Sequence, residues 1–261
     1  MADDVLVERQ GNVAVLRLND PKTLNAMTPA MAHYITDQLT HPQSDVRAIV
    51  LAGSERCFCS GANLWGDDHY DMASPDFDAG ETLATIINPM MLALKGSQVP
   101  IISAVRGSAV GVGASLALAA DIVVAGRGAY ILQAFSRVGL VPDGGTPFLL
   151  AQSIGRIRTM ELLLLAEKLP VEKALEWGLV TRVVEDAEVE PTALDIASRL
   201  ARGPTRALAL TRRGVWEGAA LGWEQELELE CKLQSVAART ADFQEGMAAF
   251  AERRPPNFTG S

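Results

Sequence analysis

Apolar and polar residues repeat along this chain with two different periods, and the period changes several times. Short apolar runs bounded by glycine or proline, such as residues 47–53 (RAIVLAG) and 99–107 (VPIISAVRG), are typical of buried strands. Apolar residues spaced three and four apart predict helices over residues 29–40 and 82–97. Short strands that alternate with helices indicate an α/β protein.

Turn and cap residues place the ends of several elements. Two apolar strands flank residues 10–12 (QGN), which predicts a hairpin. Thr28-Pro29 is typical of a helix start, and Gly178 after VEKALEW is typical of a helix end. The last part of the chain shows only helical periodicity. We therefore expect a core over residues 1–195 and a helical region over residues 196–261.

Composition and charge restrict the classes of partner. Hydrophobic residues make up 48% of the 261 residues and charged residues 21%, so the chain can bury a sizeable core. The net charge is −9, and binding to nucleic acid or to an anionic membrane needs clustered Lys and Arg. We expect neither partner. A small anionic ligand stays open, because it requires only a local basic patch.

No segment predicts targeting to a membrane. The first ten residues carry acids where a signal peptide needs a positive charge. Residues 99–126 are strongly apolar, but Arg106 and Asp121 interrupt them and leave a stretch too short to span a bilayer. We expect a cytoplasmic protein.

The cysteines predict neither a disulfide framework nor a metal centre. There are three, Cys57, Cys59 and Cys231, and an odd number without paired spacing does not indicate disulfides. The neighbouring pair at positions 57 and 59 lacks the further His or Cys that a zinc site needs. We interpret these two residues as buried thiols and expect no metal.

Two motifs that suggest common chemistries are incomplete. The segment GVGASL follows an apolar strand, but Leu116 stands where a dinucleotide fingerprint requires its third glycine. Ser115 follows Gly113 as in a nucleophile elbow, yet Ala117 replaces the second glycine of that motif. Neither a dinucleotide fold nor a serine hydrolase is predicted.

Two glycine-rich turns follow directly after buried strands. They are CSGANL (59–64) and GSAVGVGAS (107–115), and small residues there let a ligand approach backbone N–H groups. Two such donors from different turns could hold a developing oxyanion. About thirty residues later, the segment VGLVPDGGTPF (138–148) places Asp143 between a proline and two glycines in apolar surroundings. Burial raises the pKa of a carboxyl group and strengthens it as a base.

Six segments, in this order, together resemble the crotonase superfamily, also called the enoyl-CoA hydratase/isomerase family. The resemblance covers essentially the whole chain, and the segments are LNDPKTLNAMT, CFCSGANL, AVRGSAVGVGASLALAADIVVA, FSRVGLVPDGGT, ALEWGLVTRVV and PNFTG. It implies a ββα spiral core, a C-terminal helical region used in trimer assembly, and often a hexamer of two trimers. It also implies an acyl-CoA thioester as substrate, so coenzyme A enters as part of the substrate rather than as a cofactor.

The resemblance assigns the oxyanion hole to the N–H groups of Ala62 and Val112. Many relatives have glycine at the position of Val112, and a backbone donor survives that change. Relatives usually carry Asp at the position of Asn63. The substrate and coenzyme A site is matched by the set Lys22, Leu24, Ala26, Ser60, Gly61, Asn63, Leu64, Gly111, Ser115 and Phe135.

The acids of the family distinguish between its reactions. Hydratases of this family use two glutamates to activate water, and these positions hold Ser115 and Phe135 here. Asp143 lies at the turn where several isomerases carry their working carboxylate. A single carboxylate suffices to move a proton from C2 to C4 and convert a 3-enoyl-CoA into a 2-enoyl-CoA, without a metal or redox cofactor. The segment FSRVGLVPDGGT also resembles the ring-epoxide CoA isomerases of phenylacetate breakdown.

Three alternatives stay open. The first is a hydratase, which requires either a different alignment around Phe135 or an acid from the polar loop at residues 65–81, such as Asp67, Asp68 or Glu81. The second is other crotonase chemistry, such as thioester hydrolysis or C–C bond cleavage. A homologue that binds acyl-CoA without turnover would be insensitive to the loss of Asp143.

Overall fold

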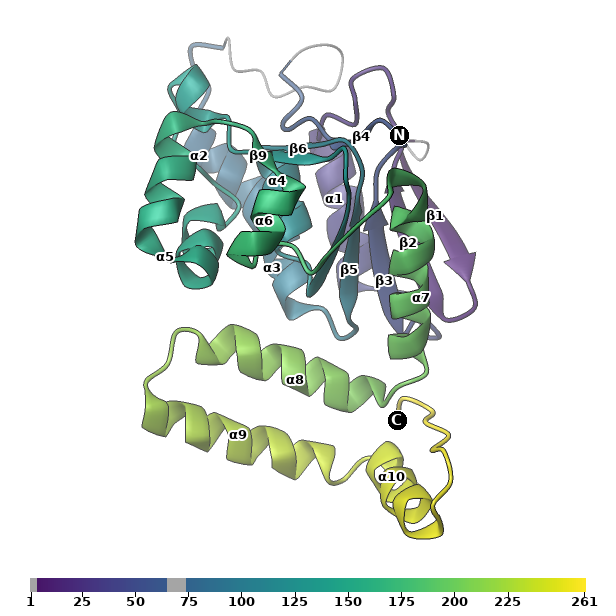
Figure 1. Ribbon diagram of the computed structural model, residues 1–261. Helices are drawn as coiled ribbons and strands as arrows, with labels where there is room; N and C mark the ends of the chain where they lie inside the picture. The colour runs from purple at the N-terminus through teal and green to yellow at the C-terminus, as the bar shows by residue number, and fades with distance from the viewer. Residues whose placement is uncertain (1–3, 65–73) are drawn as a thin grey trace.

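The computed structural model describes residues 4–64 and 74–261, whose strands form two sheets (Figure 1). The larger sheet has the order β1-β2-β3-β5-β7-β10, and its strands are parallel except for β1. Its strands are β1 (Val5–Gln10), β2 (Val13–Leu18), β3 (Ala48–Ala52), β5 (Ile101–Val105), β7 (Ile122–Gly126) and β10 (Arg182–Val184). The smaller sheet has the order β4 (Cys57–Cys59), β6 (Ser108–Val110), β8 (Tyr130–Leu132) and β9 (Leu169–Pro170).

The chain winds by repeating one unit. Each of the pairs β3–β4, β5–β6 and β7–β8 adds one strand to the larger sheet and the next strand to the smaller sheet, and a helical segment follows. The helices of these units are α3 (Asn88–Gly96), preceded by α2 (Ala79–Thr82) and a π-helical turn (Leu83–Ile87), then α4 (Val112–Leu118) and α5 (Thr146–Leu165). The α/β class and the ββα spiral expected from the sequence are confirmed.

The remaining helical segments flank this spiral. They are α1 (Pro29–Thr40), α6 (Val171–Trp177), α7 (Val189–Ala201), α8 (Thr205–Gly218), α9 (Trp223–Ala237) and α10 (Ala241–Glu252), with 3-10 turns at Phe135–Val138 and Asp186–Glu188. In Figure 1, α7 covers one face of the larger sheet, whereas α8, α9 and α10 extend below both sheets. Helix α7 crosses the boundary expected at residue 195, and the helices that stand apart begin at α8.

Alternation along the central strands divides the core into two layers. Every residue of β3 is buried. Ile49 and Leu51 belong to the larger apolar cluster, while Ala48, Val50 and Ala52 pack in a second cluster with the apolar face of α7. The two faces of β3 therefore pack into different apolar clusters. Because both faces are buried, the sequence of this parallel strand is a continuous apolar run.

Local signals in the sequence fix most element ends. The Thr28 hydroxyl accepts a hydrogen bond from the Met31 N–H at 3.1 Å, and Gly178 ends α6 with a left-handed φ of 84°. Gly155, with φ of 74°, interrupts the helical backbone within α5. The hairpin turns at Gly11, as predicted, with φ of 58°.

Within the described residues, no helix combines the length and the apolar character that crossing a membrane requires. Cys57 and Cys59 are buried, as the sequence predicts.

Candidate active site

The first glycine turn is held by the loop that precedes α1. The Met27 N–H donates to the Gly61 carbonyl at 2.7 Å, and the Asn63 N–H donates to the Met27 carbonyl at 2.8 Å. Successive backbone amides of an extended segment point to opposite sides. The N–H of Ala62 therefore points away from Met27, on the open side of the turn.

Side chains of the same loop reinforce this contact. The buried amide of Asn25 donates to the carbonyls of Cys57 (2.9 Å) and Phe58 (3.2 Å), and the Ser60 hydroxyl donates to the Thr23 carbonyl at 2.9 Å. The predicted residues of this loop thus lie alongside the first turn. Lys22 and Leu24 are exposed and Ala26 is buried, while in the turn Gly61 and Asn63 are buried and Ser60, Ala62 and Leu64 are half-buried.

The second glycine turn begins α4. Gly111 has φ of 51°, a conformation that favours glycine, and Val112 is the first helical residue, whose N–H has no acceptor within the helix. At Gly113 a Cβ atom would lie 2.5 Å from the Cβ of Cys59. Only glycine lets the start of α4 approach the end of β4 this closely.

The two turns lie side by side. Strands β4 and β6 pair in parallel, so both turns leave the same end of neighbouring strands. A Cβ atom built on Gly111 would lie 3.9 Å from the Cα of Gly61. The turns that carry Ala62 and Val112 therefore lie next to each other, and an oxyanion hole formed by their N–H groups stays a prediction.

Asp143 is a partly buried carboxylate in a turn made by glycines. Gly144 and Gly145 have φ of 62° and 76°, a region that favours glycine. The Oδ1 atom of Asp143 is buried and has no hydrogen-bond partner among the described residues. Burial raises the pKa of Asp143 to about 6. This carboxyl group is poised to exchange a proton near neutral pH.

The two positions that carry glutamates in hydratases contribute no acid. Ser115 is completely buried, and its hydroxyl contacts the carbonyls of Gly111 (3.1 Å) and Asp143 (3.3 Å) and the hydroxyl of Thr146. The ring of Phe135 lies beside Gly111, 3.8 Å from the place of a Cβ atom there. Both side chains pack around the second turn.

Sequence reasoning missed one residue of this site and could not place others. Thr146 is identified as part of the site only by its contact with Ser115 in the structure. In the sequence, a hydroxyl residue at a helix start indicates a helix cap. The side chains proposed for the polar loop at positions 67 and 68 lie outside the described residues, and Glu81 lies in α2.

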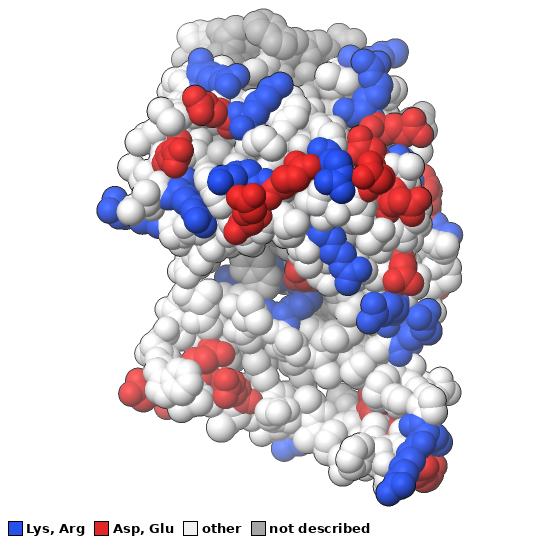
Figure 2. Space-filling model, viewed as in Figure 1, with Lys and Arg blue, Asp and Glu red and all other residues white. Residues whose placement is uncertain are grey.

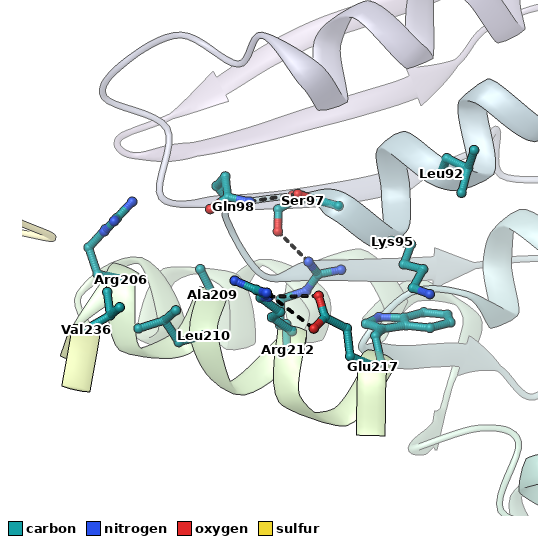
Figure 3. Close-up of a pocket in the computed structure, with 13 residues that line it drawn as sticks. Leu92, Lys95, Ser97, Gln98, Arg206, Ala209, Leu210, Arg212, Glu217 and Val236 are labelled. Atoms are coloured by element: carbon teal, nitrogen blue, oxygen red, sulfur yellow. Dashed lines mark hydrogen bonds and ion pairs between the residues drawn. The ribbon is translucent and has the colours of Figure 1, made fainter. Parts of the chain in front are cut away.

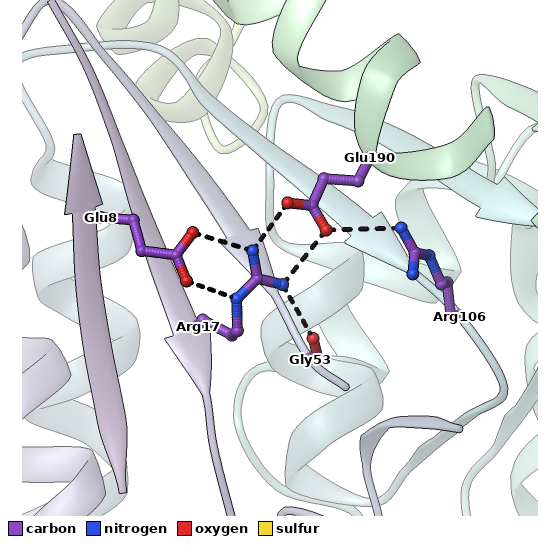
Figure 4. Close-up of polar contacts among 5 residues, drawn as sticks. All are labelled: Glu8, Arg17, Gly53, Arg106 and Glu190. Atoms are coloured by element: carbon purple, nitrogen blue, oxygen red, sulfur yellow. Dashed lines mark hydrogen bonds and ion pairs between the residues drawn. The ribbon is translucent and has the colours of Figure 1, made fainter. Parts of the chain in front are cut away.

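A charged network links β1 and β2 to α7 and to the segments that precede β4 and β6 (Figure 4). Arg17 donates to Glu8 (2.7 and 3.0 Å), to Glu190 (2.7 and 3.1 Å) and to the Gly53 carbonyl (3.3 Å), so all five of its N–H groups can be used. Arg106 donates to the same Glu190 at 3.4 Å. Gly53 precedes β4 and Arg106 precedes β6, so the network joins the hairpin and α7 to the segments that lead into both turns.

A cavity of about 600 Å³ lies away from these residues, between α3 and α8 (Figure 3). Figure 2 shows a hollow between the core and the C-terminal helices. Arg212 spans it and donates to the Asp121 carboxylate (2.6 Å) and to the carbonyls of Ser97 (2.5 Å) and Leu94 (3.1 Å). Because Arg212 is used in these contacts, we interpret the hollow as the junction of the two regions.

The spiral of two sheets and the site at its edge define a class of protein. Two backbone donors from neighbouring turns can stabilise an oxyanion, and a desolvated carboxylate nearby can transfer a proton. Residues 8–261 match the family model described as enoyl-CoA hydratase/isomerase. The chain belongs to the enoyl-CoA hydratase/isomerase family and is an enzyme of that family.

Relatives of both reaction types resemble the chain over nearly its whole length. A Rhodobacter capsulatus protein named "probable enoyl-CoA hydratase" is 40% identical, covering 95% of each chain. The 1,2-epoxyphenylacetyl-CoA isomerase of Escherichia coli is 37% identical and covers 100% of each chain. The crystal structure of an enoyl-CoA hydratase from Polaromonas superposes with a TM-score of 0.88 at 29% identity, covering 97% of this chain and 99% of that one. The solved structures that resemble this chain are enoyl-CoA hydratases with the crotonase fold.

Proposed function

We propose that this enzyme is an enoyl-CoA isomerase that converts a 3-enoyl-CoA into the conjugated 2-enoyl-CoA. The observation that carries the proposal is the partly buried carboxylate of Asp143, beside two positions where hydratases have glutamates and this chain has Ser115 and Phe135.

The proposed reaction begins at the thioester carbonyl. Its oxygen accepts hydrogen bonds from the N–H groups of Ala62 and Val112, which stabilise the enolate that forms when C2 loses a proton. A single donor of this kind is typically worth about 10²–10³ in rate. Asp143 accepts the C2 proton as the electrons move into the thioester. It then returns the proton to C4, so the double bond shifts by one position and the base is regenerated.

The environment of Asp143 supports this role. A general base works best when its pKa lies near the operating pH, and burial raises the pKa of this group to about 6. The hydroxyl of Ser115 and the ring of Phe135 cannot take a proton from water. Support also comes from the isomerase relative, which matches this chain from end to end.

The same proposal covers the ligand and the assembly. Coenzyme A lies along residues 22–26, where Lys22 is exposed beside the first turn, and no further cofactor takes part. The protein assembles as a homotrimer or as a hexamer of two trimers. Large apolar side chains exposed on the C-terminal helices support assembly, namely Val215 (72%), Trp223 (72%) and Phe250 (82%).

The test follows the absorbance of the conjugated enoyl thioester. Purified protein is mixed with a 3-enoyl-CoA, and the absorbance is expected to rise. Asp143→Asn is expected to lower kcat by about 10²-fold or more. Asp195→Asn, an exposed position on α7, is the matched control.

A 2-enoyl-CoA tests hydration in parallel. Loss of its absorbance at a rate that Asp143→Asn does not change would identify a hydratase, as the name of the Rhodobacter relative suggests for that protein. Binding of acyl-CoA without either reaction would identify a non-catalytic homologue.

A further inference from the structure

Two buried hydroxyl groups connect the turn of Asp143 to the second glycine turn. Ser115 and Thr146 are 0% and 1% exposed, and their hydroxyl oxygens are in hydrogen-bond contact. Ser115 comes from α4, and Thr146 is the first residue of α5. The contact thus joins the helix that begins at Val112 to the helix that begins directly after the Asp143 turn.

Counting protons fixes the direction of these hydrogen bonds. The Thr146 hydroxyl contacts only Ser115 among the described side chains and carbonyls, while the Ser115 hydroxyl also reaches the carbonyls of Gly111 and Asp143. Each hydroxyl has one proton to donate. Both protons are used only if Thr146 donates to Ser115, and Ser115 donates to the two carbonyls in a shared hydrogen bond.

Those two carbonyls belong to the two halves of the site. The carbonyl of Gly111 immediately precedes the N–H of Val112, in the same peptide unit. The carbonyl of Asp143 also accepts the Thr146 N–H at 3.1 Å, so it is held from two sides. A single hydroxyl group thereby sets the position of the base relative to an oxyanion donor.

The turn that carries Asp143 packs closely against Ser115. A Cβ atom on Gly144 would lie 2.8 Å from the Cβ of Ser115 and 3.1 Å from its Oγ. The Asp143 turn therefore rests directly on Ser115. Ser115 is fully buried, so its hydroxyl is enclosed by the surrounding protein atoms.

We propose that the hydroxyl pair of Ser115 and Thr146 positions the Asp143 carboxylate against the oxyanion donor at Val112. Both are positioning residues, which act through Asp143 and not by contact with substrate. The proposal rests on the proposed isomerase function and assigns to Ser115 a role different from that of the hydratase glutamate at this position.

The kinetic test uses Ser115→Ala and Thr146→Val, which remove each hydroxyl with little change of volume. We expect kcat to fall about tenfold or more, because small displacements of a catalytic group are costly, while KM changes less than twofold. Thr146→Ser keeps the hydroxyl and is expected to retain most of the activity. In the Asp143→Asn background, Ser115→Ala is expected to cause no further loss. A full additional loss in that background would overturn the proposal.

A second measurement does not depend on activity. The carboxyl of Asp143 is titrated by ¹³C NMR, with its signal assigned from Asp143→Asn. Ser115→Ala and Thr146→Val free the turn and admit water, so the pKa of Asp143 is expected to fall toward its ordinary value. A changed melting temperature with an unchanged pKa and unchanged kcat would assign the hydroxyls a merely structural role and overturn the proposal.

The two measurements separate this proposal from the proposed function. If the wild-type protein does not isomerise a 3-enoyl-CoA but the pKa of Asp143 falls in Ser115→Ala, the isomerase function is wrong and the positioning role stands. If the wild-type protein isomerises its substrate and neither kcat nor the pKa responds to either variant, the positioning role is wrong alone.

Discussion

Asp143 occupies a place that favours chemistry at the expense of stability. Its Oδ1 atom is buried without a hydrogen-bond partner among the described residues, so the charged form is poorly solvated. The same desolvation raises the pKa of the group to about 6 and makes the carboxylate a stronger base. Activity and stability therefore depend on the charge of this side chain in opposite ways.

Replacement of Asp143 by Asn is expected to stabilise the fold at high pH. The pKa of Asp143 rises from 3.8 to about 6 on folding, so the folded state binds the proton more tightly and loses stability as the pH increases between these values. The gain in unfolding free energy is up to about 3 kcal/mol above pH 7. It should shrink steadily as the pH falls from 6 toward 4.

Urea denaturation across this pH range measures the effect, with Asp195→Asn as the exposed control. An equal gain at pH 8 and at pH 4 would mean that the Asp143 carboxyl is not desolvated in the folded protein.

The isomerase rate is expected to follow the ionisation of Asp143. A base must be unprotonated, so kcat/KM should fall about tenfold for each pH unit well below the pKa of about 6 and level off above it. Initial rates with a 3-enoyl-CoA between pH 4.5 and 8.5 provide the profile. A flat profile through pH 6 would argue against this carboxylate as the base.

Contacts between elements depend on single glycines. Gly113→Ala would place a methyl group 2.5 Å from the Cβ of Cys59, so α4 must shift away from β4. We expect a loss of about 1–3 kcal/mol in unfolding free energy, together with a loss of activity as the Val112 donor moves. Gly96→Ala is the matched control, since nothing lies within 4 Å of its Cβ position. Thermal and urea unfolding of both variants would reveal the difference, and equal stability would contradict the tight contact.

The charged network around Arg17 is expected to contribute to stability as a unit. Arg17→Met leaves Glu190 without its closest partner and frees the Gly53 carbonyl, in a setting where the Arg17 side chain is 19% exposed. Hydrogen bonds to charged groups are worth about 1.5–3 kcal/mol each, but water replaces part of what is lost at this partly exposed site, so a net loss of about 2–3 kcal/mol is expected. Arg213→Met breaks only the exposed pair with Glu217 and should cost less than about 0.5 kcal/mol. Urea unfolding compares the two variants, and similar losses would show that the network carries no special weight.

Helix ends that depend on neighbouring residues were predictable from the sequence, whereas contacts between residues far apart in the chain were not. Thr28 and Gly178 carry their own cap chemistry, so the ends of α1 and α6 agree with the sequence. Only part of the mostly apolar run at residues 179–184 forms a strand, because β10 covers Arg182–Val184. The repeat of strand pairs left no fixed period in the sequence, because the connections between its units differ in length.

The candidate active site was likewise predictable only in part. The two glycine turns and Asp143 were identified from small-residue patterns and from the family resemblance. The contact between Ser115 and Thr146 was not, because 31 positions separate these residues and neither has a distinctive neighbourhood. Such a contact depends on where the first turns of α4 and α5 lie relative to each other, and patterns in a single sequence do not contain that information.

On the scale of the molecule, large apolar side chains are exposed on the C-terminal helices as well as on α5 and the segment before it. Phe250 is 82% exposed and Met247 is 55% exposed on α10, while Trp223 is 72% exposed at the start of α9. Exposed apolar surface of this kind is typical of association interfaces and supports the proposed assembly. On the face seen in Figure 2, uncharged areas separate the charged side chains of the C-terminal helices.

Phe250→Asp is therefore expected to weaken the proposed trimer. Light scattering after size-exclusion chromatography should give a trimer or hexamer mass for the wild type and a lower mass for the variant at low micromolar concentration. Leu175→Asp, on α6 of the core and 41% exposed, is the control. A wild-type protein that runs as a monomer at all concentrations would exclude the assembly.

The pairing of β4 with β6 has a consequence for how such a site can change over time. The two turns that carry the proposed oxyanion donors leave adjacent strands, which main-chain hydrogen bonds hold roughly 4.8 Å apart. Substitutions such as valine at position 112 leave that spacing intact. Acidic residues around the two turns can then be gained, lost or moved to another turn without changing this spacing. The same pair of backbone donors can therefore be inherited by enzymes that catalyse different reactions.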